Sequence, residues 1–289
     1  MAQTPPFIKL ALPKGRMEKG VLDLLAGAGV QLTASSRQYR PLLSLTEFET
    51  KILKPQNIVE MLHLGSCDIG FAGADWVAEL KADLVELLDT SLDPVRLVAA
   101  APESLLEDGR LPNRALVVAT EYPNLTEQWI LRHEISARVV RSYGATEVFP
   151  PEDADCIVDN SASGLTLKAN QLVIVDQLMT SSTRLYANPK TLECHEKREG
   201  IERLVLILES VLEARKRVML EVNVGAAQLE SVISILPCMR TPTIAPLYKD
   251  NAYAVRAAVP RSSLPNLIPA IKASGGTDIV VSSLSQITP

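Results

Sequence analysis

Histidine and cysteine are scarce in this sequence, and their scarcity limits the chemistry that it can carry. The 289 residues include only three histidines, which lie far apart: His63, His133 and His195. They do not support a Ser-His-Asp set. The cysteines are equally dispersed and form no CxxC pair, which argues against a zinc site or a disulfide framework: Cys67, Cys156, Cys194 and Cys238. We therefore expect reduced thiols in a cytoplasmic protein.

An excess of positive charge and long apolar runs are also missing. The formal net charge is −5, whereas a general nucleic-acid-binding protein normally carries a basic excess. No apolar run reaches the ~18 residues that cross a bilayer. The first residues lack the charged segment and long apolar core of a signal peptide. These absences exclude nucleic acid and membranes as expected partners.

Short apolar runs alternate with amphipathic segments over residues 1–210, which is typical of an α/β fold with helices on both faces of the sheets. Expected strands include residues 7–12, 84–88, 95–101, 116–120, 156–158 and 172–179. There is enough chain for two sheets with a cleft between them. We expect one lobe over 1–97 with 178–213 and a second over 98–177.

A different order of elements follows residue 216. The pattern predicts strands at 218–223, 243–248, 252–259 and 278–283, with helices at 225–236 and 262–274. This β-α-β-β-α-β order is that of a ferredoxin-like domain. We therefore expect a separate regulatory or assembly domain over 214–289, with a linker near 214–217.

The stretch from Ala154 to Asn170, ADCIVDNSASGLTLKAN, combines an apolar strand, a turn of small residues and the start of a helix. Backbone N–H groups and hydroxyls converge at such a turn and can bind an anion. Gly164 can adopt a positive φ, and small side chains allow close approach. The same pattern also fits a capped turn without a ligand.

A turn with two cations follows the first strand. Lys14 and Arg16 flank Gly15 and can bind phosphates, although two solvated charges give the same pattern. Asp75 lies in a turn flanked by glycine, at the carboxyl end of another strand, where α/β folds bind ligands. For Asp75 and Glu147, the sequence leaves open whether the carboxylate contacts a ligand or only caps a helix or lies on the surface. For Tyr122, it leaves open whether the ring contacts a ligand or packs in the core.

Several stretches together resemble ATP phosphoribosyltransferase, the first enzyme of histidine biosynthesis, in its long form. They occur in the family's order over nearly the whole chain: LPKGRM (12–17), GSCDIGFAGADW (65–76), VATEYPNLT (118–126), YGATEVFP (143–150), ADCIVDNSASGLTLKAN (154–170) and LPCMRTPTIAPL (236–247). The segment Asn160-Ser161-Ala162-Ser163 departs from the family, which more often has an apolar pair and two hydroxyl residues before the glycine.

The resemblance implies a periplasmic-binding-protein-like body that transfers the 5-phosphoribosyl group of phosphoribosyl pyrophosphate to N1 of ATP, with Mg²⁺. It also implies feedback inhibition by histidine through the C-terminal domain and a homo-oligomer that changes from dimer to hexamer. The metal ligands are not identified by the resemblance, although Asp75 and Glu147 are candidates for contact with a substrate hydroxyl or with Mg²⁺.

On this basis we assign site residues as hypotheses. The donor's ribose and 5′-phosphate are expected on Asp159, Ser161, Ala162, Ser163, Gly164, Leu165 and Thr166. ATP is expected on Lys14, Gly15, Arg16, Asp75, Tyr122 and Glu147, where Tyr122 would stack on adenine. The expected catalytic residues are Lys14, Arg16 and Asp159. Regulatory histidine is expected between subunits, near Ser234, Leu236, Thr243, Asp250 and Ala254.

Two other functions explain part of the pattern. A non-catalytic two-lobed protein that binds a small anion would share the lobes and the hydroxyl-rich turn. A catalytically silent regulatory subunit would share the whole fold. The basic turn and the retained Asp159, Gly164 and Thr166 argue for the enzyme.

Overall fold

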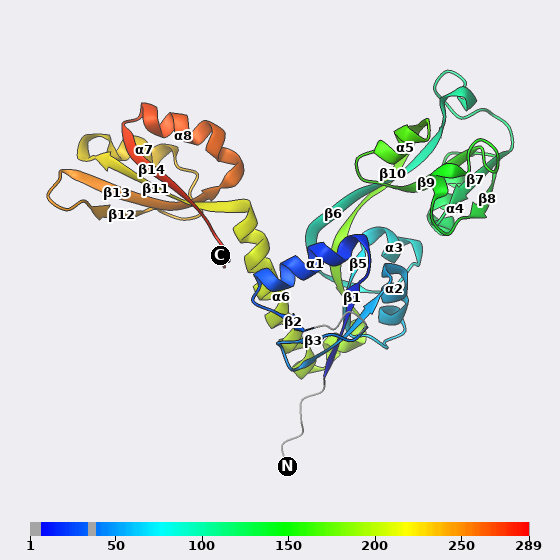
Figure 1. Ribbon diagram of the computed structural model, residues 1–289, viewed down its shortest axis with the longest axis horizontal. Coiled ribbons are helices and arrows are strands. Elements are labelled where there is room, and N and C mark those ends of the chain that lie inside the picture. Colours follow the sequence, from blue (N-terminus) through cyan, green and yellow to red (C-terminus); the bar gives the residue numbers. More distant parts are fainter. Residues whose placement is uncertain (1–6, 34–38, 289) are drawn as a thin grey trace, which may run out of the picture. The chain divides into compact units, whose positions relative to one another are not determined.

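The computed structural model describes residues 7–33 and 39–288, and the chain divides into two compact units (Figure 1). Unit 1 contains Met1–Asp23 and Val30–Glu202, and unit 2 contains Leu24–Gly29 and Arg203–Pro289. Each unit has its own sheet and its own hydrophobic core.

Unit 1 is a mixed α/β structure around one sheet. Among the described residues, this sheet has ten strands in the order β2-β3-β4-β1-β5-β10-β6-β9-β7-β8. The strands are β1 (Ile8–Pro13), β2 (Leu32–Thr33), β3 (Leu42–Leu43), β4 (Phe48–Leu53), β5 (Ile69–Gly73), β6 (Val85–Pro102), β7 (Leu116–Thr120), β8 (Ala137–Arg141), β9 (Cys156–Ser161) and β10 (Leu172–Ala187). The helices are α1 (Arg16–Gly27), α2 (Pro55–His63), α3 (Ala74–Glu79), α4 (Pro123–Arg132) and α5 (Leu165–Ala169), and the part of α1 from Leu24 onward belongs to unit 2.

Parallel pairing forms the two ends of this sheet, as the alternating pattern predicts. At one end β1 pairs in parallel with β4 and β5, and at the other β7 pairs in parallel with β8 and β9. All five residues of β5 are buried, which explains why its sequence is apolar or small throughout rather than alternating. Apart from Glu147, which follows β8, the residues predicted for the two substrates lie at or shortly after the carboxyl ends of β1, β5, β7 and β9.

Two long antiparallel strands join the two ends, and here the prediction of separate short strands was wrong. The expected strands 84–88 and 95–101 form the single strand β6, and the expected strand 172–179 extends to Ala187 as β10. They pair from Leu172↔Pro102 to Ala187↔Val85 with several bulges. Ser91 and Asp93 have positive φ inside β6, which a pattern of residue types does not separate from a turn. The predicted pair of sheets is therefore one sheet with two strand groups, called here the β1 group (β2, β3, β4, β1, β5) and the β9 group (β9, β7, β8).

Unit 2 has the predicted ferredoxin-like order. The last part of α6 (His195–Lys216) leads into β11 (Arg217–Gly225), α7 (Leu229–Ile235), β12 (Thr243–Pro246), β13 (Ala252–Pro260), α8 (Leu264–Ala273) and β14 (Gly276–Ser283). The sheet order is β12-β13-β11-β14, with antiparallel neighbours. Alternate residues of β11 are buried against the core, as expected for a sheet covered on one face. The fold class is confirmed for both units.

Short 3₁₀ helices complete the described elements: Glu103–Leu105, Thr146–Val148, Pro189–Glu193, Ala226–Gln228 and Arg261–Ser263. In the part of the chain that the structure describes, no helix is both long and apolar enough to cross a membrane. All four cysteines are free.

Candidate active site

The stretch singled out in the sequence forms a strand, a turn and a short helix, as predicted. Strand β9 ends at Ser161, the turn follows, and α5 begins at Leu165. Gly164 has φ 76°, a left-handed conformation that non-glycine residues rarely adopt, and a Cβ added at this position would meet nothing within 4 Å. Glycine is therefore required here for backbone conformation rather than for space.

A cavity of about 330 Å³ opens over this turn and collects residues from distant parts of unit 1. It is lined by Arg16, Glu121, Gly144, Glu147, Asp159, Asn160, Ser161, Ala162, Ser163, Gly164, Thr166 and Leu167. We call it the donor cavity. It brings together every residue predicted for the phosphoribosyl donor except Leu165, whose side chain is 70% exposed and does not line it. Arg16 and Glu147, predicted for ATP, line the same cavity.

Three carboxyl groups line the donor cavity, and two of them act on the pKa of the third. Burial raises the pKa of Asp159 to about 6, and the nearby Glu121 and Glu147 add to the rise. The backbone N–H of Asn160 donates to Asp159 Oδ1 at 2.7 Å and opposes it. Burial also raises the pKa of Glu121. The cavity therefore has a carboxylate-rich side beside the hydroxyls of the turn, which suits a ligand with both sugar hydroxyls and phosphates.

A smaller cavity of about 80 Å³ lies over the basic turn. It is lined by Lys14, Arg16, Met17, Pro55, Gly73, Asp75, Trp76, Asp93, Asn160, Ser181, Ser182 and Thr183. We call it the second cavity. Three residues predicted for ATP, Lys14, Arg16 and Asp75, meet here. Gly15 has φ 90°, which lets the chain turn from β1 into α1 and leaves both cations exposed.

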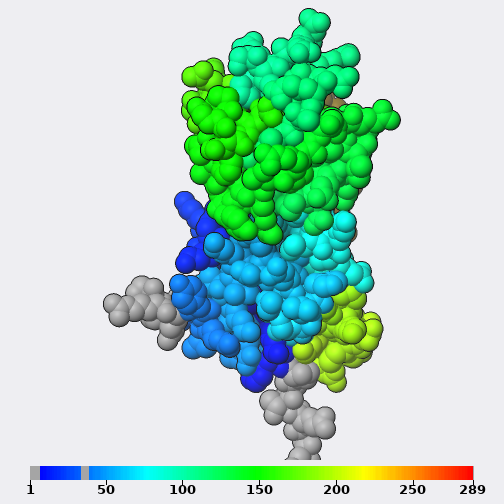
Figure 2. Space-filling model, turned by 90° about the vertical axis from the view of Figure 1, so that its right-hand side faces the viewer, coloured from blue at the N-terminus to red at the C-terminus, as the bar shows by residue number. Residues whose placement is uncertain are grey.

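Helix α3, which follows β5, contacts helix α4, which follows β7. Figure 2 shows the green part of unit 1, which contains the β9 group, against the blue and cyan part with α1 to α3. Glu79 at the end of α3 accepts hydrogen bonds from the N–H groups of Asn124 and Leu125, which begin α4. These N–H groups have no partner inside their own helix. The carboxylate therefore caps α4 and ties it to α3.

Tyr122 does not occupy the place predicted for it. Its side chain is 0% exposed, its ring stacks on Trp76 with centroids 4.5 Å apart, and it lines neither cavity. No face of the ring is open to adenine in this arrangement. The phenol instead donates to Asp75 Oδ2 at 2.7 Å, and Asp75 is itself only 3% exposed. The ring position therefore agrees with the packing alternative for Tyr122 rather than with stacking on adenine.

Sequence reasoning missed Glu121 and Asn160 as cavity residues. Glu121 directly follows the carboxyl end of β7, a location that could have marked it. Asn160 stood out only as a departure from the family pattern.

The donor set fits a metal ion that is held mainly by its substrate. Within residues 7–33 and 39–288, no three His, Cys, Asp or Glu side chains gather closely enough to hold a metal by themselves. Mg²⁺ usually binds one or two carboxylates and completes its shell with substrate phosphates and water. Asp159, Glu121 and Glu147 line the donor cavity and supply such carboxylates.

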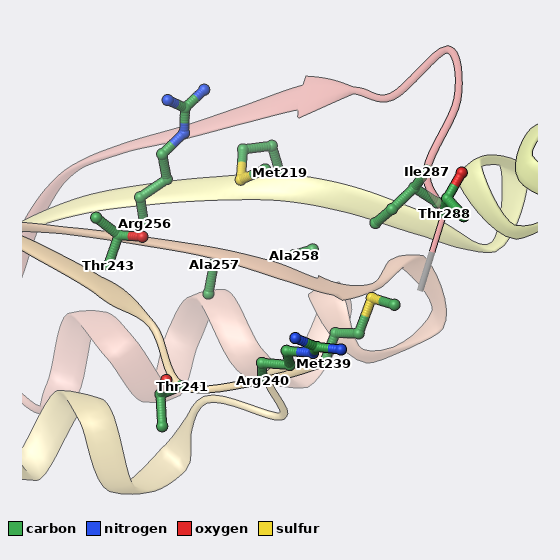
Figure 3. A pocket seen from close by; sticks show the side chains of 10 residues that line it. All are labelled: Met219, Met239, Arg240, Thr241, Thr243, Arg256, Ala257, Ala258, Ile287 and Thr288. Atoms are coloured by element: carbon green, nitrogen blue, oxygen red, sulfur yellow. The ribbon is translucent and has the colours of Figure 1, made fainter.

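The residues predicted for regulatory histidine are spread over unit 2. Thr243 lines a cavity of about 430 Å³, shown in Figure 3, together with Met219, Met239, Arg240, Thr241, Arg256, Ala257, Ala258, Ile287 and Thr288. Leu236 is buried in the core. Ser234 and Asp250 are exposed, and Ala254 is half-buried on β13. Of the five, only Thr243 lines this cavity.

Comparisons with known proteins agree over both units. The sequence model of the family ATP phosphoribosyltransferase matches residues 54–210, and that of the family HisG, C-terminal domain matches residues 214–286. The ATP phosphoribosyltransferase of Chlorobium phaeobacteroides is 35% identical over 285 residues, 97% of each chain. That of Pelotomaculum thermopropionicum is 34% identical over 287 residues, covering 98% of this chain and 99% of the other. A solved structure, the ATP phosphoribosyl transferase (HisG:HisZ) complex from Thermotoga maritima, aligns with a TM-score of 0.64 and 28% identity, over 72% of this chain and 99% of that one.

Proposed function

The chain belongs to the ATP phosphoribosyltransferase family, and on this premise we propose how its residues carry out the family's reaction. The enzyme transfers the 5-phosphoribosyl group of phosphoribosyl pyrophosphate to N1 of ATP, the first step of histidine biosynthesis. The bond from the anomeric carbon to the pyrophosphate oxygen breaks, and a bond from that carbon to N1 of adenine forms.

One observation carries the assignment of residues: the donor cavity combines the Asp159–Thr166 turn with the Arg16 guanidinium from the opposite strand group. We place the 5′-phosphate on the hydroxyls of Ser163 and Thr166 and the N–H groups of the turn. The Asp159 carboxylate accepts hydrogen bonds from the ribose hydroxyls. Phosphate and hydroxyl groups are thereby held at one strand end, which orients the anomeric carbon.

The basic turn then faces the leaving group. Lys14 and Arg16 neutralise the charge that grows on pyrophosphate, or bind the ATP phosphates next to it. Arg16 can reach either ligand because it lines both cavities. The transition state has oxocarbenium character and needs little proton transfer, so charge neutralisation and alignment contribute most of the rate. This agrees with the small number of histidines.

Mg²⁺, when bound with the pyrophosphate, would add further charge neutralisation. We propose that Asp159, Glu121 and Glu147 supply the protein's share of its ligands.

Because the Tyr122 ring is buried against Trp76, adenine must bind somewhere other than on this ring. We propose that ATP enters beside Lys14 and Arg16 at the second cavity. At about 80 Å³ this cavity is far smaller than ATP, so the bulk of the nucleotide would extend beyond it.

We propose that the C-terminal domain, residues 214–289, carries regulation by histidine, and that residues 1–97 with 178–213 and residues 98–177 act as the two catalytic lobes. The cavity around Thr243 suits an amino acid, because the hydroxyls of Thr241 and Thr243 and the guanidinium of Arg240 can bind its polar groups. Thr243→Arg would fill this cavity. We expect this variant to lose inhibition by histidine and to keep its activity; unchanged inhibition would place the histidine site elsewhere.

The family's change from dimer to hexamer is proposed for this chain as well. The solved Thermotoga maritima structure is itself a complex. A cytoplasmic location agrees with four free thiols, which persist in a reducing compartment.

A spectroscopic assay tests the activity. The protein is mixed with ATP, phosphoribosyl pyrophosphate, Mg²⁺ and pyrophosphatase, and the ultraviolet absorbance of the adduct is followed. We expect a rise that depends on both substrates. No rise at any protein concentration would favour a protein that only binds the ligands.

A further inference from the structure

Two residues, Arg16 and Asn160, line both the donor cavity and the second cavity; within the described chain no other residue is shared by their linings. Arg16 comes from the start of α1 and Asn160 from the end of β9, so they lie on opposite strand groups. The Arg16 Nη1 atom donates to Asn160 Oδ1 at 3.3 Å. This contact therefore marks the boundary between the two cavities.

Asn160 is in turn held from its buried side. Its Nδ2 atom donates to the Tyr122 hydroxyl at 3.0 Å, and that hydroxyl donates to Asp75 Oδ2 at 2.7 Å. Ser181 Oγ donates to the other carboxylate oxygen, Asp75 Oδ1, at 2.8 Å. The contacts from Arg16 through Asn160 and Tyr122 to Asp75 form one continuous chain, called here the Arg16–Asp75 chain.

The direction of every hydrogen bond in this chain is determined by its two ends. Arginine can only donate, and the two Asp75 carboxylate oxygens accept from Tyr122 and from Ser181. Burial, together with the Asp75 carboxylate, raises the pKa of Tyr122, so its hydroxyl stays protonated and donates to Asp75. The Asn160 amide must then turn Nδ2 toward Tyr122 and Oδ1 toward Arg16. An acceptor is thereby presented to the guanidinium in one fixed orientation.

The side chains at the two ends of the Arg16–Asp75 chain differ in conformational freedom. Tyr122 and Asp75 are buried, and the Tyr122 ring is packed on Trp76. Arg16 is exposed. The buried end therefore restricts the exposed end. Asn160 limits the rotamers that the Arg16 side chain can adopt, so that less conformational entropy is lost when the guanidinium binds its ligand.

We propose that Asn160 is a positioning residue, which holds the Arg16 guanidinium at the boundary of the two cavities in the orientation that meets the diphosphate of the donor. The inference rests on the proposed function, in which Arg16 binds that diphosphate. An apolar side chain of similar size at position 160 would leave the donor cavity open and Arg16 unrestrained.

Steady-state kinetics of four proteins test this: the unaltered enzyme, Asn160→Leu, Arg16→Ala and the double variant. One hydrogen bond to a charged group in a partly exposed place is worth about a fivefold to tenfold change, so we expect Asn160→Leu to lower kcat/KM for phosphoribosyl pyrophosphate by about that factor. In the Arg16→Ala background the same substitution should change kcat/KM by less than about twofold, because Asn160 acts through Arg16.

Controls separate this from a loss of structure or of function. Asn223→Leu replaces another hydrogen-bonded asparagine on a strand, in unit 2, and should leave kcat/KM unchanged. Thermal unfolding checks that each variant is folded; if Asn160→Leu is not, Asn160→Ala also removes the acceptor and takes its place.

Three results would overturn the inference: no loss from the substitution at Asn160, an equal loss with and without Arg16, or no loss from Arg16→Ala. An inactive unaltered enzyme would instead refute the proposed function itself.

Discussion

Replacing Asp159 by asparagine should make the protein more stable at neutral pH and much less active. The side chain lies among other acids in the donor cavity, where burial and the charges of Glu121 and Glu147 raise its pKa to about 6 from the ordinary value of 3.8. Its ionised form is therefore disfavoured in the folded protein. Asparagine has nearly the same shape, keeps an oxygen that can accept the Asn160 N–H, and carries no charge.

The size of the effect follows from the pKa. A rise of about two units corresponds to about 3 kcal/mol between the two protonation states. Because the folded pKa is the higher one, the folded protein binds more protons between pH 4 and pH 6 than the unfolded chain does. The stability that protonated Asp159 contributes is complete below about pH 4 and is lost as pH rises through about 6. Asp159→Asn should remove this loss and raise the free energy of unfolding at pH 7.5 by up to about 3 kcal/mol.

Urea denaturation at pH 4 and at pH 7.5 measures this directly. The variant should gain stability at pH 7.5 and little at pH 4. Its kcat/KM should fall by at least about tenfold, because a neutral amide accepts hydrogen bonds from ribose hydroxyls more weakly than a carboxylate does.

Asp155→Asn is the matched control with the opposite sign. Burial raises the pKa of Asp155, but the hydrogen bonds from Arg114 and from the Val117 N–H outweigh this and leave the pKa lowered. That substitution should therefore destabilise the protein at pH 7.5. An Asp159→Asn variant that is less stable than the unaltered protein at pH 7.5, or equally changed at both pH values, would refute the reasoning.

Three further substitutions have expected outcomes. Gly164→Val places a β-branched residue at φ 76°, which costs about 1–2 kcal/mol and distorts the turn; turnover should be abolished while circular dichroism shows a folded protein, and near-normal activity would contradict the phosphate assignment. Lys197→Met leaves the buried Asp68 carboxylate without the ammonium that contacts both of its oxygens at 2.9 Å; urea denaturation should show a loss of about 3 kcal/mol, and a change below about 1 kcal/mol would mean that its other partners suffice. Tyr122→Phe removes the hydroxyl between Asn160 and Asp75. It should lower kcat/KM by a factor close to that of Asn160→Leu. An unchanged kcat/KM would show that the hydrogen bonds of the Arg16–Asp75 chain do not act together in catalysis.

The predictions that held were those that depend on local patterns. The apolar run of β5 and the alternation in β11 are visible in the order of residues, because burial on two faces or on one face selects them directly. The β-α-β-β-α-β order of unit 2 followed from the same periodicities. The turn at Ser161–Gly164 was predicted at a strand's end for the same reason.

The predictions that failed concerned the long strands and Tyr122. The strands expected at 84–88 and 95–101 are one strand, because pairing with β10 carries β6 through the irregular backbone at Ser91 and Asp93. A tyrosine beside a proline gave no indication of whether its ring faces a ligand or the core. Burial against Trp76, 46 positions earlier in the chain, settled that question.

The sequence alone therefore indicated the family, the order of elements in unit 2 and the positions of the Ser161–Gly164 turn and the basic turn. The tertiary structure alone determined which side chains meet. Arg16 and Asn160 are separated by 144 positions and Asp75 and Tyr122 by 47, and both pairs are in hydrogen-bond contact. Residue periodicity reports the environment of each element along its own length. Contacts between elements depend on sheet order and on which side chains at the starts of α1 and α3 meet those at the ends of β7 and β9, which no local pattern encodes.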